Sequence, residues 1–238
     1  MTKREKGADR RERLEAVQRE QKAAQRKRNV TTAVVGVAAG ALIIGGTVFA
    51  ISNQQKNKPE NRSASRYGVS ASAAACDGVL ESPSSKSGNH VGPGTNTPKE
   101  THVNYSTIPP TGGPHFPVWL ESSINFYSVA DKPKVENLVH NLEHGYTVVW
   151  YLPTLPADQV SALKGLSATI AAKLPGNKFI VAPWDTTRGD FPAGKTVAIS
   201  HWGTKHGYRQ FCGQVSGEAI QQFVDAHPST DSPEPNAA

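Results

Sequence analysis

The longest apolar run in the chain is Val30 to Ile51, which contains 22 residues and no charge. As a helix it would extend about 33 Å, enough to cross a hydrocarbon core of about 30 Å. Three basic residues, Arg26 to Arg28, precede it, and positive flanking charge stays in the cytoplasm. We therefore expect a single-pass protein of the cell membrane. Residues 1–29 would form a charged cytoplasmic tail, 30–51 the transmembrane helix, and the remaining chain would be extracytoplasmic. The run and its leader are too long for a cleaved signal peptide.

Beyond this run, the pattern indicates one folded region between two polar segments. Residues 52–100 are rich in Ser, Asn, Lys, Pro and Gly, which is typical of a disordered linker. Residues 228–238 carry three prolines and no aromatic residue, which predicts a disordered tail. The region between them, 101–227, contains all four tryptophans and is long enough to bury a core.

Helical and strand-like patterns alternate within residues 101–227. The first helix is expected to begin near Pro133, after a cap at Asp131, and to end at Gly145. Apolar residues at helical spacing or in short runs predict the remaining elements. These are helices over 157–173 and 218–226, and strands over 148–151, 179–182 and 196–202. This order predicts an α+β fold, a small sheet with helices packed on one face, and a parallel strand pair across the 157–173 helix.

The formal net charge of +6 belongs to one short segment of the chain. Residues 1–28 contain eleven Lys and Arg against five Asp and Glu, so that the remaining chain is neutral. A basic tail beside a transmembrane helix fixes its orientation and can rest on anionic lipid headgroups. We therefore expect the lipid bilayer as a partner, and no nucleic acid.

The two cysteines, Cys76 and Cys212, both lie on the expected outer side of the membrane, where disulfides persist. A bond between them would close a loop of about 137 residues, worth roughly 5 kcal/mol in the chain-entropy treatment. Two free thiols or an intermolecular bond are the alternatives. No Cys-x-x-Cys pair occurs, so a thiol-exchange enzyme is not expected.

Two histidines lie on one face of the first predicted helix. His140 and His144 are four residues apart, a spacing at which two imidazoles can bind one metal ion. Both point away from the aliphatic stripe of that helix, which consists of Val135, Leu138, Val139 and Leu142. The alternative for His144 is a simple interaction with the end of the helix.

Further histidines upstream extend this set. His102 and His115 lie in a segment rich in glycine and proline, so the candidate metal ligands are His102, His115, His140 and His144. Glu143 is expected either as another ligand or as a hydrogen-bond partner of one. Histidine ligands suit zinc or copper(II), and the single methionine, Met1, excludes a thioether copper(I) site. His201 and His206 are further candidates, although a strand position favours a hydrogen-bonded His201.

The sequence His140-Asn-Leu-Glu143-His144 also matches the signature of inverted zinc metallopeptidases, in which the glutamate is the general base. The motif stands at the end of one short helix, and no further carboxylate ligand is marked. We therefore expect no catalytic residue, and the protein is more readily interpreted as a binding protein than as an enzyme.

Three motifs together resemble a known family. They are the segments 109–116, with Pro-Pro-Thr-Gly-Gly-Pro-His-Phe, and 138–145, with Leu-Val-His-Asn-Leu-Glu-His-Gly, and His201-Trp-Gly ahead of Cys212. In this order they resemble the Domain of Unknown Function 3105 family over about residues 76–226. The resemblance implies a bacterial, often actinobacterial, protein anchored by one N-terminal helix, and singles out His115, His140, Glu143 and His144. It implies no particular reaction.

Three functions remain open from the sequence. The first is a membrane-anchored extracytoplasmic accessory protein that binds a transition metal at its histidines, alone or beside an envelope protein. The second is a structural or interaction module of an envelope complex without metal. The third is a zinc-dependent hydrolase built on His140, Glu143 and His144.

Overall fold

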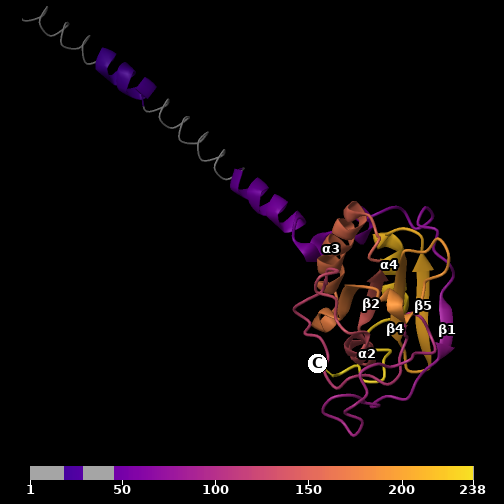
Figure 1. The fold of residues 1–238 in the computed structure, drawn as a ribbon. Helices are drawn as coiled ribbons and strands as arrows, with labels where there is room; N and C mark the ends of the chain where they lie inside the picture. The colour runs from indigo at the N-terminus through magenta and orange to yellow at the C-terminus, as the bar shows by residue number, and fades with distance from the viewer. Residues whose placement is uncertain (1–18, 29–45, 238) are drawn as a thin grey trace, which may run out of the picture. The chain divides into compact units, whose positions relative to one another are not determined.

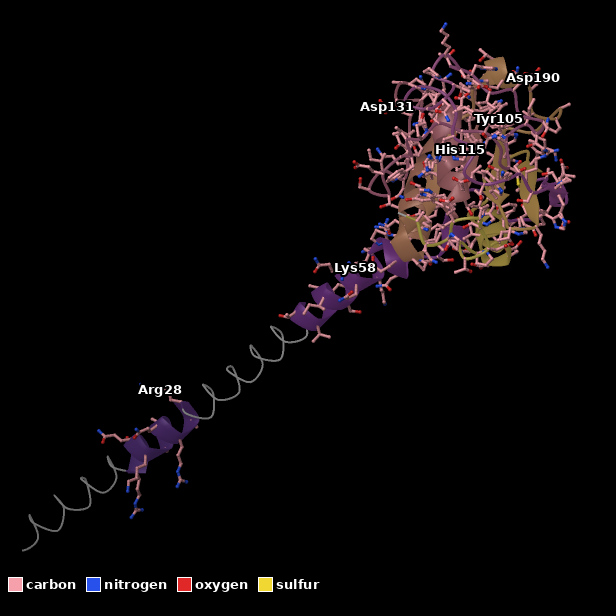
Figure 2. The ribbon with its side chains drawn as sticks, turned by 90° about the horizontal axis from the view of Figure 1, so that it is seen from below. Arg28, Lys58, Tyr105, His115, Asp131 and Asp190 are labelled. Atoms are coloured by element: carbon pink, nitrogen blue, oxygen red, sulfur yellow. A yellow bond between two sulfur atoms is a disulfide. The ribbon has the colours of Figure 1, made fainter. Side chains whose placement is uncertain are left out.

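The computed structural model of the protein describes residues 19–28 and 46–237. The chain divides into two compact units, Met1–Asn57 and Lys58–Ala238. In the first unit, residues 19–28 and 46–56 are helical, and Arg28 ends the first of these stretches (Figure 2). Most of the expected transmembrane helix over 30–51 lies outside the described residues. Within 19–28 and 46–237, no helix is long and apolar enough to cross a membrane.

The second unit is built on a five-stranded mixed sheet with strand order β1-β5-β4-β2-β3 (Figure 1). The strands are β1 (Leu80–Pro83), β2 (Thr147–Tyr151), β3 (Phe179–Pro183), β4 (Val197–Trp202) and β5 (His206–Cys212). The α-helices of this unit are α2 (Val135–Glu143), α3 (Ala157–Ala171) and α4 (Gly217–Ala226). Short 3-10 helices span Pro59–Asn61, Ala64–Arg66, Pro175–Asn177 and Thr186–Arg188. The α+β class is confirmed, as is the parallel pairing of β2 with β3 across α3.

Helices cover both faces of this sheet, so the prediction of helices on one face is wrong. On one face, α3 and α4 pack on residues such as Val149 and Val181. On the other face, α2 packs on Val148 and Ile180. The physical reason is visible in β2, β3 and β4, in which every residue is buried. Strands that are apolar on both sides need a layer on each face.

The face of α2 turned away from the sheet is also buried. The segment before α2 covers it and bonds to its polar side chains. Asn141 donates to the Leu120 carbonyl and accepts from the Leu120 N–H, both over 2.8 Å. Asn137 donates to the Val118 carbonyl over 2.6 Å. The polar side chains on this face therefore hold an outer layer of chain in place.

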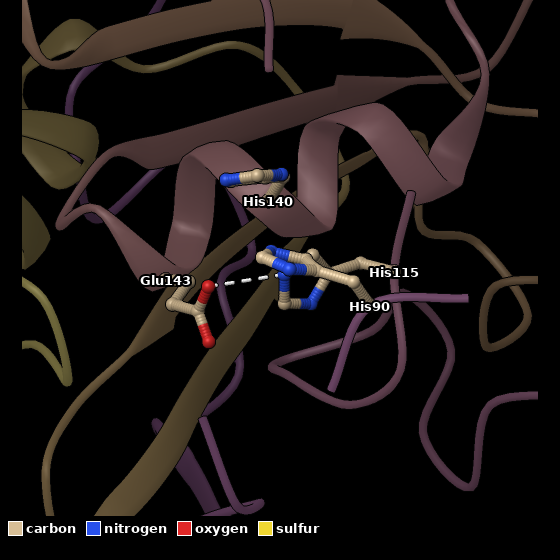
Figure 3. Close-up of side chains that lie close together, drawn as sticks. All are labelled: His90, His115, His140 and Glu143. Atoms are coloured by element: carbon tan, nitrogen blue, oxygen red, sulfur yellow. Dashed lines mark ion pairs between the residues drawn. The ribbon is translucent and has the colours of Figure 1, made fainter. Parts of the chain in front are cut away.

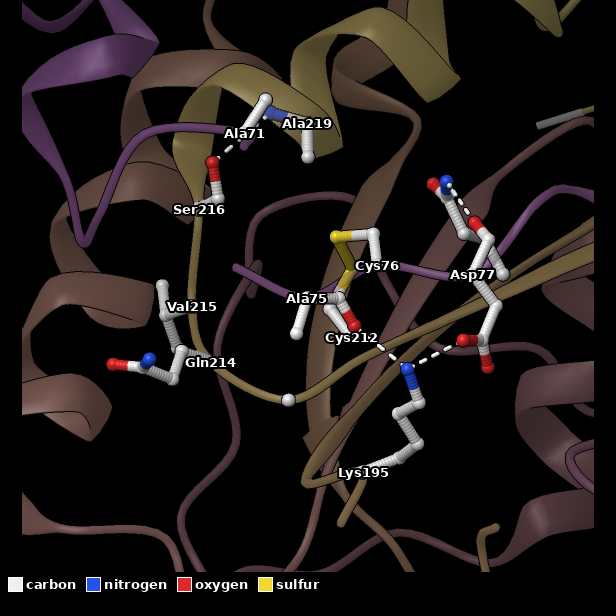
Figure 4. Close-up of a disulfide and its surroundings, with 12 residues drawn as sticks. Ala71, Ala75, Cys76, Asp77, Lys195, Cys212, Gln214, Val215, Ser216 and Ala219 are labelled. Atoms are coloured by element: carbon white, nitrogen blue, oxygen red, sulfur yellow. Dashed lines mark hydrogen bonds and ion pairs between the residues drawn. A yellow bond between two sulfur atoms is a disulfide. The ribbon is translucent and has the colours of Figure 1, made fainter. Parts of the chain in front are cut away.

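Much of the expected linker over 52–100 belongs to the folded unit. Strand β1 pairs antiparallel with β5, and Cys76 is disulfide-bonded to Cys212, which confirms the predicted bond (Figure 4). Beside the bond, Lys195 donates to the Ala75 carbonyl over 2.7 Å. A polar segment of this kind is held by backbone pairing and a covalent bond, neither of which its composition reveals.

The C-terminal residues 228–237, expected to be disordered, instead pack over the end of α2. Glu234 donates its backbone N–H to the Glu143 carbonyl over 3.0 Å, and Ser232 is buried. The ammonium group of Lys178 donates to the carbonyls of His144, Pro235 and Ala237 at 2.7, 2.7 and 3.0 Å. Because these contacts use backbone groups and one distant lysine, the proline-rich composition does not predict them.

Candidate metal centre

Four side chains from three segments of the chain meet beside α2. His90, His115, His140 and Glu143 each offer a ligand atom, and these atoms lie within 4.8 Å of one another (Figure 3). The ring centroids of the three histidines are 4.7 to 4.9 Å apart. His115 lies in the interior of the folded unit, whereas Asp131 and Asp190 lie at its periphery (Figure 2). His90 is exposed and the other three residues are buried, so the group is open to solvent on the His90 side.

His115 is placed by backbone pairing with the segment that carries His90. Its N–H donates to the Asn89 carbonyl over 3.1 Å, and its carbonyl accepts from Val91 over 2.8 Å. This short parallel bridge brings His90 and His115 side by side. Upstream, Gly112 lies so close to the Trp202 indole that a Cβ there would be 2.7 Å from ring atoms. A glycine at that position lets the loop lie flat against the core.

Two of the histidines are fixed in one tautomer. Nδ1 of His115 lies 2.8 Å from the Gly113 carbonyl, and Nδ1 of His140 lies 2.7 Å from the Phe116 carbonyl. A carbonyl oxygen only accepts hydrogen bonds, so each Nδ1 carries the hydrogen. In the neutral ring each Nε2 is then an acceptor, available as a ligand atom. Metal-binding histidines are commonly oriented by such Nδ1–H bonds to backbone carbonyls.

Glu143 presents its carboxylate to this group from the last turn of α2. One oxygen, Oε1, accepts the Gly88 N–H over 2.6 Å. The other, Oε2, lies 3.0 Å from His115 Nε2, and both side chains are fully buried. Neither of these two atoms has a partner with hydrogen-bond geometry among the described residues. An acceptor oxygen and an acceptor nitrogen at this distance require a proton or a cation between them.

The surroundings shift the pKa of two members of the group. Burial, together with the nearby His115, His144 and His90, lowers the pKa of His140 to about 4, although the Phe116 carbonyl acts against this. His140 is therefore neutral at neutral pH. Burial alone would raise the pKa of Glu143, but contact with His115 and the Gly88 N–H outweighs burial and lowers it. The group thus combines neutral and anionic donors suited to a cation.

His144 lies next to the group rather than within it. Its Nε2 is 3.1 Å from Nε2 of His140 and 3.8 Å from a carboxylate oxygen of Glu234. Glu143, His144 and Glu234 form a second set whose ligand atoms also lie within 4.8 Å of one another. The indole of Trp119 covers both helix histidines, with ring centroids 5.5 and 5.6 Å away.

The remaining histidines predicted as ligands lie elsewhere. His102 is exposed, contacts the side-chain oxygen of Asn104 over 2.8 Å, and belongs to neither set. His201 is buried between the carbonyls of Asp231 and Tyr146, at 2.8 and 3.3 Å. His206 lies 3.4 Å from Glu81 at the surface. His90, which completes the first set, was not predicted because it stands in the expected linker.

The donor set fits a borderline transition metal. Three imidazole nitrogens and one carboxylate oxygen supply four ligands, which is the number that zinc takes in tetrahedral sites. The same nitrogen and oxygen donors suit copper(II). Both cysteines are joined in the disulfide, so no thiolate contributes. The unsatisfied pair of His115 and Glu143 is the place where a cation would relieve an electrostatic cost.

Comparison with known proteins leads to one family. No curated protein and no solved structure matches the chain. The family described as "Protein of unknown function (DUF3105)" matches residues 96–238, which is more than half of the chain. The matched range contains His115, His140, Glu143, His144 and Glu234, whereas His90 and Cys76 precede it. The chain belongs to the DUF3105 family.

Proposed function

We propose that this protein is a membrane-anchored extracytoplasmic accessory protein that binds a transition metal, zinc or copper(II), through His90, His115, His140 and Glu143. The observation that carries the proposal is the contact between His115 and Glu143. Two buried acceptor atoms face each other without a hydrogen bond, at a point on which two further imidazoles converge. A divalent cation at this point would interact favourably with all four side chains.

An alternative is a purely structural role, in which a protonated His115 forms an ion pair with Glu143. That pair would need neither His90 nor His140. The metal proposal is favoured because the three imidazoles gather within 4.9 Å of one another, and because Nδ1 of both His115 and His140 is bonded to a carbonyl. Such anchoring directs Nε2 into the group whether or not a proton is present.

A hydrolase is not proposed. In an inverted zinc metallopeptidase the two helix histidines bind the metal and the glutamate acts as base on a bound water. Here one oxygen of Glu143 is bonded to the Gly88 N–H and the other faces His115. Its carboxylate therefore lies among the candidate ligands, which is the position of a ligand rather than of a general base.

The extracytoplasmic location of the folded unit is proposed from the sequence and from the disulfide. Val30 to Ile51 is uncharged and follows three basic residues, which favours a span with the folded unit outside. The disulfide between Cys76 and Cys212 supports an oxidising compartment. The partners proposed are the lipid bilayer and an envelope protein, and the likeness to DUF3105 adds no reaction to this picture.

Metal analysis of the purified full-length protein tests the proposal. The parent protein should carry stoichiometric zinc or copper after equilibration and removal of excess ion. His140→Ala should lose it, whereas His206→Ala, a histidine at the surface, should retain it. Circular dichroism of each variant checks that the fold is kept. Absence of stoichiometric metal from the parent protein would refute the proposal.

A further inference from the structure

We infer that the site holds two divalent ions, the second bound by Glu143, His144 and Glu234, with the Glu143 carboxylate shared between them. This inference rests on the proposed metal-binding function and extends it from one ion to a pair. The first ion is the one assigned to His90, His115, His140 and Glu143. The ligand atoms of the second set, like those of the first, all lie within 4.8 Å of one another.

The shared residue is suited to a bridging role. A carboxylate has two oxygens and about four lone-pair sites, so the bonds that Glu143 already makes do not exhaust it. Paired metal ions in proteins commonly lie about 3.5–4 Å apart. The two ligand sets share one carboxylate, and His140 Nε2 lies 3.1 Å from His144 Nε2. This arrangement is compatible with that separation if each of the two imidazoles binds a different ion.

Glu234 is held at this position by its own backbone. Its N–H donates to the carbonyl of Glu143 over 3.0 Å, so the second carboxylate is attached to the residue that would bridge the ions. Lys178 secures the chain on either side of the contact, through the carbonyls of His144 and Pro235, both at 2.7 Å. Glu234 is thereby distinguished from an ordinary surface carboxylate, whose position is not fixed.

The two carboxylates offset part of the charge that two ions would carry. With neutral imidazoles, one divalent ion and Glu143 leave one positive charge in the first set. The second ion and Glu234 together add one more positive charge, and each carboxylate offsets part of the repulsion between the ions. The Glu234 side chain is 43% exposed, whereas that of Glu143 is fully buried. The second ion is therefore the weaker and more rapidly exchanging one, and it has more oxygen ligands.

A zinc titration of the full-length protein, followed by calorimetry and by zinc content, tests the inference. The parent should bind two equivalents, one tight and one weaker. Glu234→Gln and His144→Ala should each lose the weaker equivalent and keep the tight one. Glu60→Gln, which removes an exposed carboxylate elsewhere, should still bind two. Glu143→Gln should weaken both equivalents, because both ions use that carboxylate.

The outcomes separate the two proposals. If the parent binds one equivalent that Glu234→Gln leaves unchanged, the second ion is refuted and the first is upheld. If the single equivalent disappears in Glu234→Gln, Glu234 completes one site and the pair is again refuted. A parent protein that binds neither zinc nor copper(II) refutes both proposals. Copper(II) loading offers a check without any variant, since two ions at a few ångströms couple magnetically. The electron paramagnetic resonance intensity per copper ion should fall when the second equivalent is added. Full intensity for both ions would contradict the pair.

Discussion

The ammonium group of Lys178 donates a hydrogen bond over 2.7 Å to the carbonyl oxygen of His144, at the end of α2. Lys178 directly precedes β3, and it is only 8% exposed. Burial lowers its pKa, yet the group is bonded to three carbonyl oxygens, two of which belong to the C-terminal tail. One lysine thus joins the sheet, the end of the ligand-bearing helix and the segment that carries Glu234.

Replacement of this lysine should destabilise the fold and release the tail. Lys178→Met leaves the carbonyls of His144, Pro235 and Ala237 without their donor, which should cost about 1–3 kcal/mol of unfolding free energy. Urea unfolding measures the loss, and limited proteolysis of the C-terminus should become faster. Lys164→Met, at an exposed position of α3, is the matched control and should change neither. An unchanged cleavage rate in Lys178→Met would show that the lysine does not hold the tail.

A second prediction concerns the glycine that follows α2. Gly145 has φ +87°, and a Cβ there would meet the Ser229 carbonyl oxygen of the tail. Gly145→Ala should therefore lower the free energy of unfolding by about 1–3 kcal/mol. Gly78→Ala is a suitable control, because no atom lies within 4 Å of a Cβ at that position and its φ is not positive. Equal urea midpoints for the two variants would contradict the tight packing at Gly145.

The disulfide should contribute strongly to stability. Replacing Cys76 and Cys212 together by serine removes the constraint on a long loop and should cost about 2–5 kcal/mol of unfolding free energy. The unfolding midpoint of the parent should fall towards that of the double variant when dithiothreitol is added. If neither the unfolding midpoint nor the gel mobility of the parent protein changes on reduction, the result would argue against the bond.

The metal-free protein should lose stability in mild acid. Burial lowers the pKa of His201, although the carbonyls of Asp231 and Tyr146 act against it, and burial lowers the pKa of His227 as well. Between each lowered pKa and the unfolded value of about 6.5, the unfolded chain binds more protons. The contribution of these neutral imidazoles to the free energy of unfolding is therefore fully present above pH 6.5. It is lost as the pH falls below that value.

Urea midpoints at pH 7.5 and 5.5, in the presence of a chelator, measure this loss. His227→Gln removes one contributing ring, so the drop between the two pH values should be smaller in that variant. If the urea midpoint of the parent rises on acidification, the predicted direction of the change in stability is contradicted.

Periodicity predicted the elements that pack through their own apolar residues. Helices α2 and α3 and strands β2, β3 and β4 all carry such patterns, and all are present. Strand β5 was missed because Gly207, Arg209 and Gln210 interrupt its apolar pattern, and it is defined by pairing with β4 and β1. Pairing between distant segments is a tertiary property that a local pattern does not contain.

The site was predicted in part for the same reason. His115, His140 and Glu143 come from motifs with recognisable spacing, and the fold brings them together. His90 lies in a polar segment and joins them only through its bridge to His115. His102 resembled His115 in its sequence surroundings, but its ring contacts Asn104, two residues along the chain. The spacing of residues in the sequence identified the face of α2 that carries the ligands. Backbone pairing in three dimensions determines that His90, and not His102, joins them.

Zinc affinity of His115→Ala compared with His102→Ala tests the metal centre most directly. Both variants remove one upstream histidine, but only His115 lies in the group with Glu143. Metal binding at this group predicts that the parent binds a tight equivalent of zinc in competition with a chromophoric chelator. His115→Ala should weaken that equivalent by at least about 100-fold, with circular dichroism unchanged, and His102→Ala should match the parent. A parent that binds no tight zinc, or equal losses in the two variants, would contradict the assignment.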